Sequence, residues 1–289
     1  MPSRVRPRSS AILRDPVPVP VGPKSQPPPA DQAAAAFFDL DNTMMQGASI
    51  YWFARGLASR NYFTTGDLLR FGLRQLRFRL LATEHAGDMA QARQAALAFV
   101  EGWRVEDMAR LCEEIFDELM AERIWPGTRA LAQQHIDAGQ RVWLVTAAPV
   151  ELGRVIARRL GLTGALGTVA EIRDGVYTGR LVGELLHGPA KADAIRALAL
   201  AEGLDLTRCT AYSDSANDIP MLSAVGHAVA VNPDPALRRQ AREQGWEIRD
   251  FRTGRKAVKI AVPAALAAGV AVGAVSAGLA VRHRRDRSS

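Results

Sequence analysis

Short apolar runs alternate with longer amphipathic stretches along most of the chain. Four of the runs have the length of buried parallel strands and lie at residues 34–38, 141–145, 209–212 and 227–231. The amphipathic stretches have helical spacing and lie at about 127–139, 150–160, 189–203, 216–224 and 234–244. Strands that alternate with helices predict an α/β fold, a Rossmann-like open parallel sheet with helices on both faces.

Two segments interrupt this alternation. Residues 167–184 alternate in polarity around Asp174-Gly175, a pair typical of hairpin turns, and predict a small β-flap at the edge of the sheet. Residues 48–125 show no parallel-strand pattern and predict several helices, for example at 66–82 and 105–123. We expect this helical insertion to cover the carboxyl end of the sheet, where open α/β folds bind ligands.

The predicted core therefore comprises residues 34–47 and 126–250, and the two chain ends lie outside it. Residues 1–33 hold nine of the 16 prolines and no apolar periodicity, which predicts a disordered or polyproline-like arm. The arm also lacks the apolar stretch of a secretory signal peptide, so export by that route is not expected.

Residues 260–281 carry no charge. A helix of that length spans about 33 Å, enough for a bilayer core of about 30 Å. Basic residues flank both sides, so we expect a single membrane-spanning helix at 257–282, but these flanks do not decide its orientation. Because the chain shows no signal peptide, we expect the globular part in the cytoplasm. The sequence leaves open two alternatives, an Ala-rich helix packed into a soluble fold and a flexible tail.

The charge distribution bears on possible partners. The net charge of +7 comes from the two ends, because residues 33–248 hold three more acidic than basic side chains. A nucleic-acid-binding domain would carry its basic stripe on the fold itself, so no nucleic acid partner is expected. The two cysteines, Cys112 and Cys209, form neither a zinc-binding spacing nor a disulfide framework, which favours a reducing compartment.

The first group of candidate catalytic residues follows the first predicted strand, in the sequence Phe37-Phe-Asp39-Leu-Asp41-Asn-Thr43. Where a strand turns into a loop, Asp39 and Asp41 can converge on one point. One carboxylate can then attack an electrophile while the other holds a proton for the leaving group. The alternative is a polar turn whose carboxylates cap the segment that follows.

Other polar groups stand at the ends of later strands or the starts of helices. Thr146 ends the second predicted strand and suits a phosphate contact, although it can equally be an ordinary N-cap. Lys191 is the only lysine within residues 33–248, and its compact ammonium suits a phosphate unless it is simply a surface lysine. Asp214 and Asp218 follow the third strand as oxygen ligands suited to Mg²⁺, or as acids that complement a helix dipole.

These motifs, in this order, resemble the haloacid dehalogenase (HAD) superfamily, in particular its phosphoserine-phosphatase-like branch, subfamily IB. The segments 39–43 and 214–218 are similar to its first and fourth motifs, and Thr146 and Lys191 to its second and third. The likeness covers about residues 34–250. It implies a HAD fold in which residues 48–125 form a C1-type cap inserted after the first strand.

The resemblance also implies a mechanism. Asp39 would attack phosphorus and form an aspartyl-phosphate, and Asp41 would protonate the leaving oxygen and then activate the hydrolytic water. Mg²⁺ would be held by Asp39, the backbone carbonyl of Asp41 and Asp214, with Asp218 in support. Thr146 and Lys191 would neutralise the phosphoryl oxygens.

The chain departs from that branch at one point. Phosphoserine phosphatases usually carry an acidic residue about nine positions after the nucleophile, whereas residues 44–50 contain none here. We therefore predict a Mg²⁺-dependent phosphomonoester hydrolase attached to the membrane through residues 260–281, with a lipid phosphate or another small anionic phosphate as substrate. A cytosolic phosphoserine phosphatase is the alternative among enzymes, and a catalytically idle membrane adaptor is the alternative from another class.

Overall fold

The structure, a computed structural model, describes residues 31–62 and 100–252. Most of the Pro-rich arm, the cap helix expected at 66–82 and the membrane helix expected at 257–282 lie outside the described residues. Within the two described ranges, no helix is both long and apolar enough to cross a bilayer.

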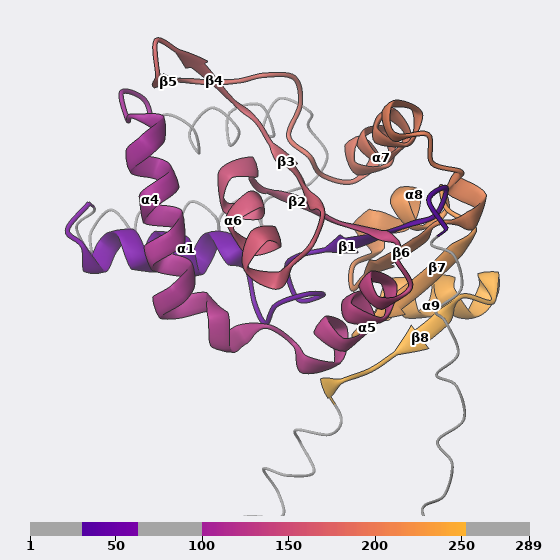
Figure 1. The fold of residues 1–289 in the computed structure, drawn as a ribbon. Helices are drawn as coiled ribbons and strands as arrows, with labels where there is room; N and C mark the ends of the chain where they lie inside the picture. Colours follow the sequence, from indigo (N-terminus) through magenta and orange to yellow (C-terminus); the bar gives the residue numbers. More distant parts are fainter. Residues whose placement is uncertain (1–30, 63–99, 253–289) are drawn as a thin grey trace, which may run out of the picture.

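A parallel sheet of six strands forms the centre of the molecule (Figure 1), in the order β3-β2-β1-β6-β7-β8. The strands are β1 (Ala35–Asp39), β2 (Arg141–Pro149), β3 (Gly164–Thr168), β6 (Thr210–Ser213), β7 (His227–Val231) and β8 (Glu247–Arg249). Four of them coincide with the predicted apolar runs. The predicted α/β fold with an open parallel sheet is therefore confirmed.

Helices cover both faces of the sheet because side chains along each strand alternate in direction. On one face, Ala36 and Phe38 belong to the same apolar cluster as residues of α5 (Pro126–Asp137) and α6 (Val150–Leu160). On the other face, Ala35 and Phe37 pack in a second cluster with α7, α8 and α9. These three helices are Pro189–Glu202, Ile219–Leu222 and Pro235–Gln244.

The register of the sheet determines where the motifs meet. Asp39, at the end of β1, pairs with Val145 of β2, and Phe38 pairs with Tyr212 of β6. All three strands are parallel, so their carboxyl ends lie at one edge of the sheet. The polar residues that follow these strands consequently gather at that edge.

The described part of the insertion contains α1 (Ser49–Ser59) and α4 (Val105–Ile115), which lie together on the left in Figure 1. The helix expected at 105–123 is regular only to Ile115. It continues as a π-helical turn, Phe116–Met120, and a 3-10 turn, Ala121–Arg123. The α4 helix and this π-helical turn pack along α6. Arg158 of α6 pairs with Glu113 at 2.5 Å, and Arg159 pairs with Asp117 at 2.7 Å.

The predicted β-flap forms a hairpin of β4 (Ala170–Arg173) and β5 (Val176–Leu181). Its turn residues, Asp174 and Gly175, both have positive φ, as a type I′ turn requires. The amide of Tyr177 donates to the carbonyl of Trp103 at 2.9 Å, and the amide of Gly102 donates to the carbonyl of Tyr177 at 2.9 Å. The hairpin of the core therefore pairs with the chain that enters α4 of the cap.

The flap boundary predicted at residue 167 is wrong, because residues 164–168 form β3 and pair with β2. Two of the five residues of this strand are glycines for a steric reason. A Cβ on Gly164 would stand 2.6 Å from the Trp143 ring, and one on Gly167 would stand 2.7 Å from the Cα of Val150. Glycine is thus required where apolar side chains would normally mark a strand. The short strand β8 was also absent from the prediction.

Candidate active site

A buried ion-pair cluster lies at the carboxyl edge of the sheet. Lys191, in the first turn of α7, places its Nζ 2.5 Å from Oδ1 of Asp39 and 2.8 Å from Oδ2 of Asp218. The three residues are 4%, 5% and 2% exposed, so water screens these contacts little. One ammonium thereby brings together the first, third and fourth of the predicted motifs.

Asp214 lies beside this cluster at the end of β6. Its Oδ1 accepts a hydrogen bond from Oγ1 of Thr43 at 3.3 Å, so the loops after β1 and β6 are in direct contact. Next to it, Oγ of Ser213 donates to Oδ2 of Asp218 at 2.7 Å. The loop that follows β6 therefore presents two carboxylates, each oriented by a hydroxyl group.

Asp41 connects the core to the first helix of the cap. Its Oδ1 accepts the backbone N–H of Ser49 at 2.8 Å, the first residue of α1. A carboxylate in this position satisfies one of the free amides at a helix N-terminus. The turn-capping alternative considered for this residue thus describes one of its contacts, and the same contact fixes the direction of its carboxylate.

Thr146 lies one residue beyond Val145, the β2 partner of Asp39. It is 1% exposed, and its Oγ1 accepts the amide of Ala148 at 3.1 Å. The N-cap of α6 is Pro149, so this local bond lies within β2 and does not make Thr146 the N-cap of that helix. The structure places Thr146 inside β2, one residue beyond the partner of Asp39, but no described hydrogen bond joins it to the carboxylate cluster.

The electrostatics of the site reflect an excess of buried negative charge. Burial raises the pKa of Asp39 to about 7, the Lys191 ammonium opposes this rise, and Asp218 and Asp41 add to it. Burial likewise raises the pKa of Asp214 to about 6, against the hydrogen bond from Thr43, and raises the pKa of Asp41. A single ammonium therefore does not balance the carboxylates around it.

This donor set has the chemistry of a Mg²⁺ site. Within residues 31–62 and 100–252, no group of three or more His, Cys, Asp or Glu side chains is arranged to hold a metal ion. The four candidate aspartates nevertheless lie together at the carboxyl edge of the sheet. Burial raises the pKa of three of them, Asp39, Asp41 and Asp214. Carboxylate oxygens are the ligands Mg²⁺ prefers, and its charge would offset this penalty.

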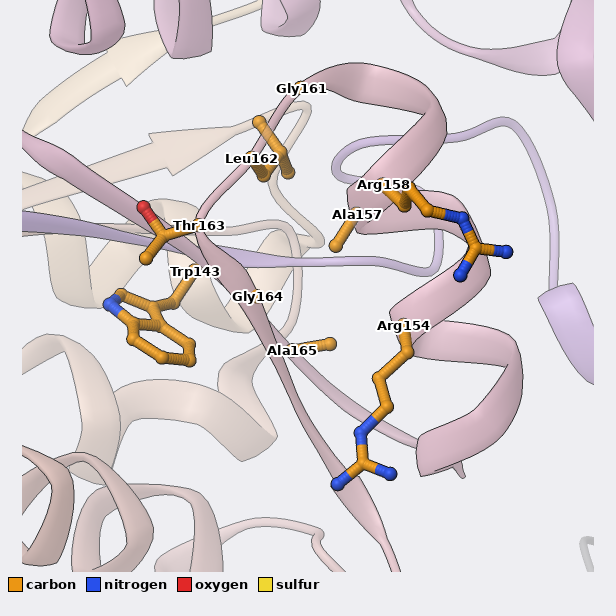
Figure 2. Close-up of a pocket in the computed structure, with 9 residues that line it drawn as sticks. All are labelled: Trp143, Arg154, Ala157, Arg158, Gly161, Leu162, Thr163, Gly164 and Ala165. Carbon is orange, nitrogen blue, oxygen red and sulfur yellow. The ribbon is translucent and has the colours of Figure 1, made fainter.

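A surface hollow elsewhere contains none of these residues. It has a volume of about 530 Å³ and lies between α6 and β3, away from the carboxyl edge. Figure 2 shows Arg154 and Arg158 of α6 on one side of β3 and the ring of Trp143 on the other. The buried aspartates, rather than this hollow, are therefore the candidate catalytic site.

Two residues that hold the loop after β6 were not predicted from the sequence. Ser213 binds Asp218, and Oδ2 of Asp234 accepts the amide of Ala216 at 2.9 Å. Neither gave a distinctive signal, because Ser213 ends a strand and Asp234 stands in an Asn-Pro-Asp-Pro sequence typical of a turn.

Comparisons with known proteins agree with this geometry. The family model of haloacid dehalogenase-like hydrolases matches residues 36–223. The phosphoserine phosphatase SerB1 of Mycobacterium tuberculosis is 60% identical over 270 residues, which cover 93% of this chain and 88% of that protein.

Solved structures show the same fold. A Bordetella pertussis protein of unknown function has a TM-score of 0.68 and 29% identity, over 75% of this chain and 98% of its own. A phosphoserine phosphatase solved as a phospho-aspartyl intermediate analogue has a TM-score of 0.52 and 21% identity, over 77% of this chain and 97% of its own. The chain therefore belongs to the haloacid dehalogenase-like hydrolase family.

Proposed function

We propose that this protein is a Mg²⁺-dependent phosphatase of small phosphomonoesters that acts through an aspartyl-phosphate on Asp39. The observation that carries the proposal is the Lys191 ammonium, held between Asp39 and Asp218 in a buried site. A carboxylate fixed in this way is a positioned nucleophile, and the adjacent ammonium can neutralise the charge of an incoming phosphoryl group.

The other residues take complementary roles in the proposed reaction. As Asp39 forms a bond to phosphorus, the bond to the leaving oxygen breaks, and Asp41 delivers a proton to that oxygen. Asp41 then takes a proton from the water that hydrolyses the aspartyl-phosphate. Thr146 and Lys191 bind the phosphoryl oxygens. The raised pKa of Asp41 suits a group that must hold a proton before releasing it.

Asp39, the backbone carbonyl of Asp41 and Asp214 would hold Mg²⁺, with Asp218 in support. When bound, the ion would supply positive charge for the phosphoryl oxygens and compensate the buried carboxylates. Ser213 and Thr43 orient two of these carboxylates through the hydrogen bonds described above.

The proposed substrate is an anionic phosphomonoester that needs no ammonium group, lipid phosphates included. Residue 48, nine positions after Asp39, is alanine, and the first turn of α1 that follows carries no acidic side chain. The similarity to a protein named phosphoserine phosphatase supports phosphoserine as the alternative substrate.

A matched substrate pair tests this point. We expect phosphoserine and its analogue without the ammonium, 3-phosphooxypropionate, to have kcat/KM values within about tenfold of each other, because residues 44–50 offer the ammonium no carboxylate. Lysophosphatidate should also be hydrolysed.

EDTA should remove all activity and added Mg²⁺ should restore it. Activity confined to phosphoserine would contradict the proposed substrate class, and activity that survives EDTA would contradict the metal requirement.

We also propose that residues 260–281 attach the protein to a membrane, on the sequence argument of length and missing charge alone. The full chain should remain in the membrane fraction after a wash with 1 M salt, whereas a chain that ends at residue 256 should appear in the supernatant. Release of the full chain by salt would show that the segment is not inserted.

A further inference from the structure

The carboxylate of Asp234 is shared between two backbone segments. It is the N-cap of α9, where its Oδ1 accepts the amide of Leu237 at 2.7 Å. Its Oδ2 accepts the amide of Ala216 at 2.9 Å, in the loop after β6. Both hydrogen bonds involve an ionised acceptor and are therefore of the stronger kind.

The backbone of Asp234 adds a third contact to the same loop. Its N–H donates to the carbonyl oxygen of Asp214 at 2.8 Å. Asp234 therefore holds the carbonyl of one candidate metal ligand and the amide two residues further on. Ala216 stands midway between Asp214 and Asp218, so a shift of its amide would displace both carboxylates.

The turn that carries Asp234 is itself firmly held. Asn232 is 2% exposed, its amide donates to the carbonyl of Arg249 at 2.7 Å, and its Oδ1 accepts the amide of Phe251 at 2.7 Å. Arg252 donates to the carbonyl of Pro233 at 3.2 Å. These contacts fix the position of the turn, so the carboxylate of Asp234 is held in place where it binds the loop after β6.

We propose that Asp234 is a positioning residue of the phosphatase site, which keeps the loop of Asp214 and Asp218 in its catalytic arrangement. The inference rests on the proposed function. It assigns separate tasks to the two oxygens: Oδ1 stabilises α9, and Oδ2 serves catalysis through Ala216. Outer partners that orient such ligands are worth roughly 10-fold to 100-fold in activity when removed.

The substitution Asp234→Ser separates helix capping from the contact with Ala216. Serine caps helices about as well as aspartate but offers one short acceptor, so Asp234→Ser keeps the bond to Leu237 and loses the bond to Ala216. We expect kcat to fall about 10-fold or more with little change in KM, and Tm to stay within about 2 °C of the wild type. In hydrogen exchange, the amide of Ala216 should lose protection while that of Leu237 keeps it.

Two further variants of Asp234 and one control variant complete the test. Asp234→Ala should lose both bonds and lower Tm as well as kcat. Asp234→Asn keeps the shape of the side chain and repeats the test if serine disturbs the turn. Asp205→Ser is the matched control, because Asp205 also caps a short helix through the amide of Thr207 but lies before β6, at the opposite end of that strand. It should leave kcat unchanged.

The readouts separate failure of this inference from failure of the proposed function. Asp234→Ser with unchanged kcat, or with unchanged exchange at Ala216, would overturn the role of Asp234. A wild-type protein without phosphatase activity would instead refute the proposed function. In that case, exchange at Ala216 would still decide whether Asp234 holds the loop.

Discussion

Asp39→Asn is expected to abolish phosphatase turnover while leaving the protein folded. The amide has the shape of the carboxylate but cannot form the aspartyl-phosphate, so kcat should fall at least about 10³-fold. Burial raises the pKa of Asp39 to about 7, which means that its charge is costly in the folded state. The neutral amide should therefore not lower Tm. Steady-state hydrolysis and circular dichroism measure the two effects.

Asp193→Asn is the matched control for this experiment. Asp193 lies on α7 and pairs with Arg196 at the surface, where its side chain is 75% exposed. Its kcat should equal that of the wild type. Full activity in Asp39→Asn would exclude Asp39 as the nucleophile. Inactivity of the wild type on every phosphomonoester would instead favour the catalytically idle adaptor.

Lys191→Met is expected to impair both catalysis and stability. Methionine keeps much of the length of lysine but leaves Asp39 and Asp218 buried without a counter-charge. Breaking a buried pair in this way lowers the free energy of unfolding by about 3–5 kcal/mol. Loss of the ammonium should also lower kcat by about 10²–10³-fold, the range for a group that stabilises transition-state charge. Urea denaturation and steady-state kinetics provide the measurements.

The same helix supplies a control for the change of charge. Arg196→Met removes a cation that is 53% exposed, so the free energy of unfolding should change by no more than about 0.5 kcal/mol and kcat should not change. Lys191→Arg should not restore activity, because a planar guanidinium does not fit where one compact ammonium contacts two carboxylates. A Lys191→Met protein as stable and active as the wild type would contradict the ion-pair cluster.

The sheet was largely predictable because its central strands are buried on both faces and therefore consist of apolar runs. β1 and β7 show this directly, since each has four consecutive buried apolar residues and only one polar residue, Asp39 or His227, at one end. β3 was missed because its small residues accommodate Trp143 and the start of α6, contacts that exist only in the folded chain. The break in the helix at Ile115 was missed because its apolar spacing continues without interruption.

The candidate site was predictable to the extent that its residues follow strands. The four aspartates could be predicted because the carboxyl ends of parallel strands lie at one edge of the sheet. They are Asp39, Asp41, Asp214 and Asp218. The Lys191 contacts needed the structure, since a single lysine at a helix start carries no information about its partners. Asp234 was missed for the same reason, because its contact with Ala216 joins two loops whose proximity depends on the sheet.

The pairing of the hairpin with the cap limits how this enzyme can be recombined with its relatives. The hydrogen bonds of Tyr177 with Trp103 and Gly102 join two segments that lie far apart in the sequence. A chimera that imports a foreign cap at residues 48–125 would replace the partners of Tyr177 and leave β5 paired with β4 alone. Recombination should therefore preserve function best when β4 and β5 are exchanged together with the cap.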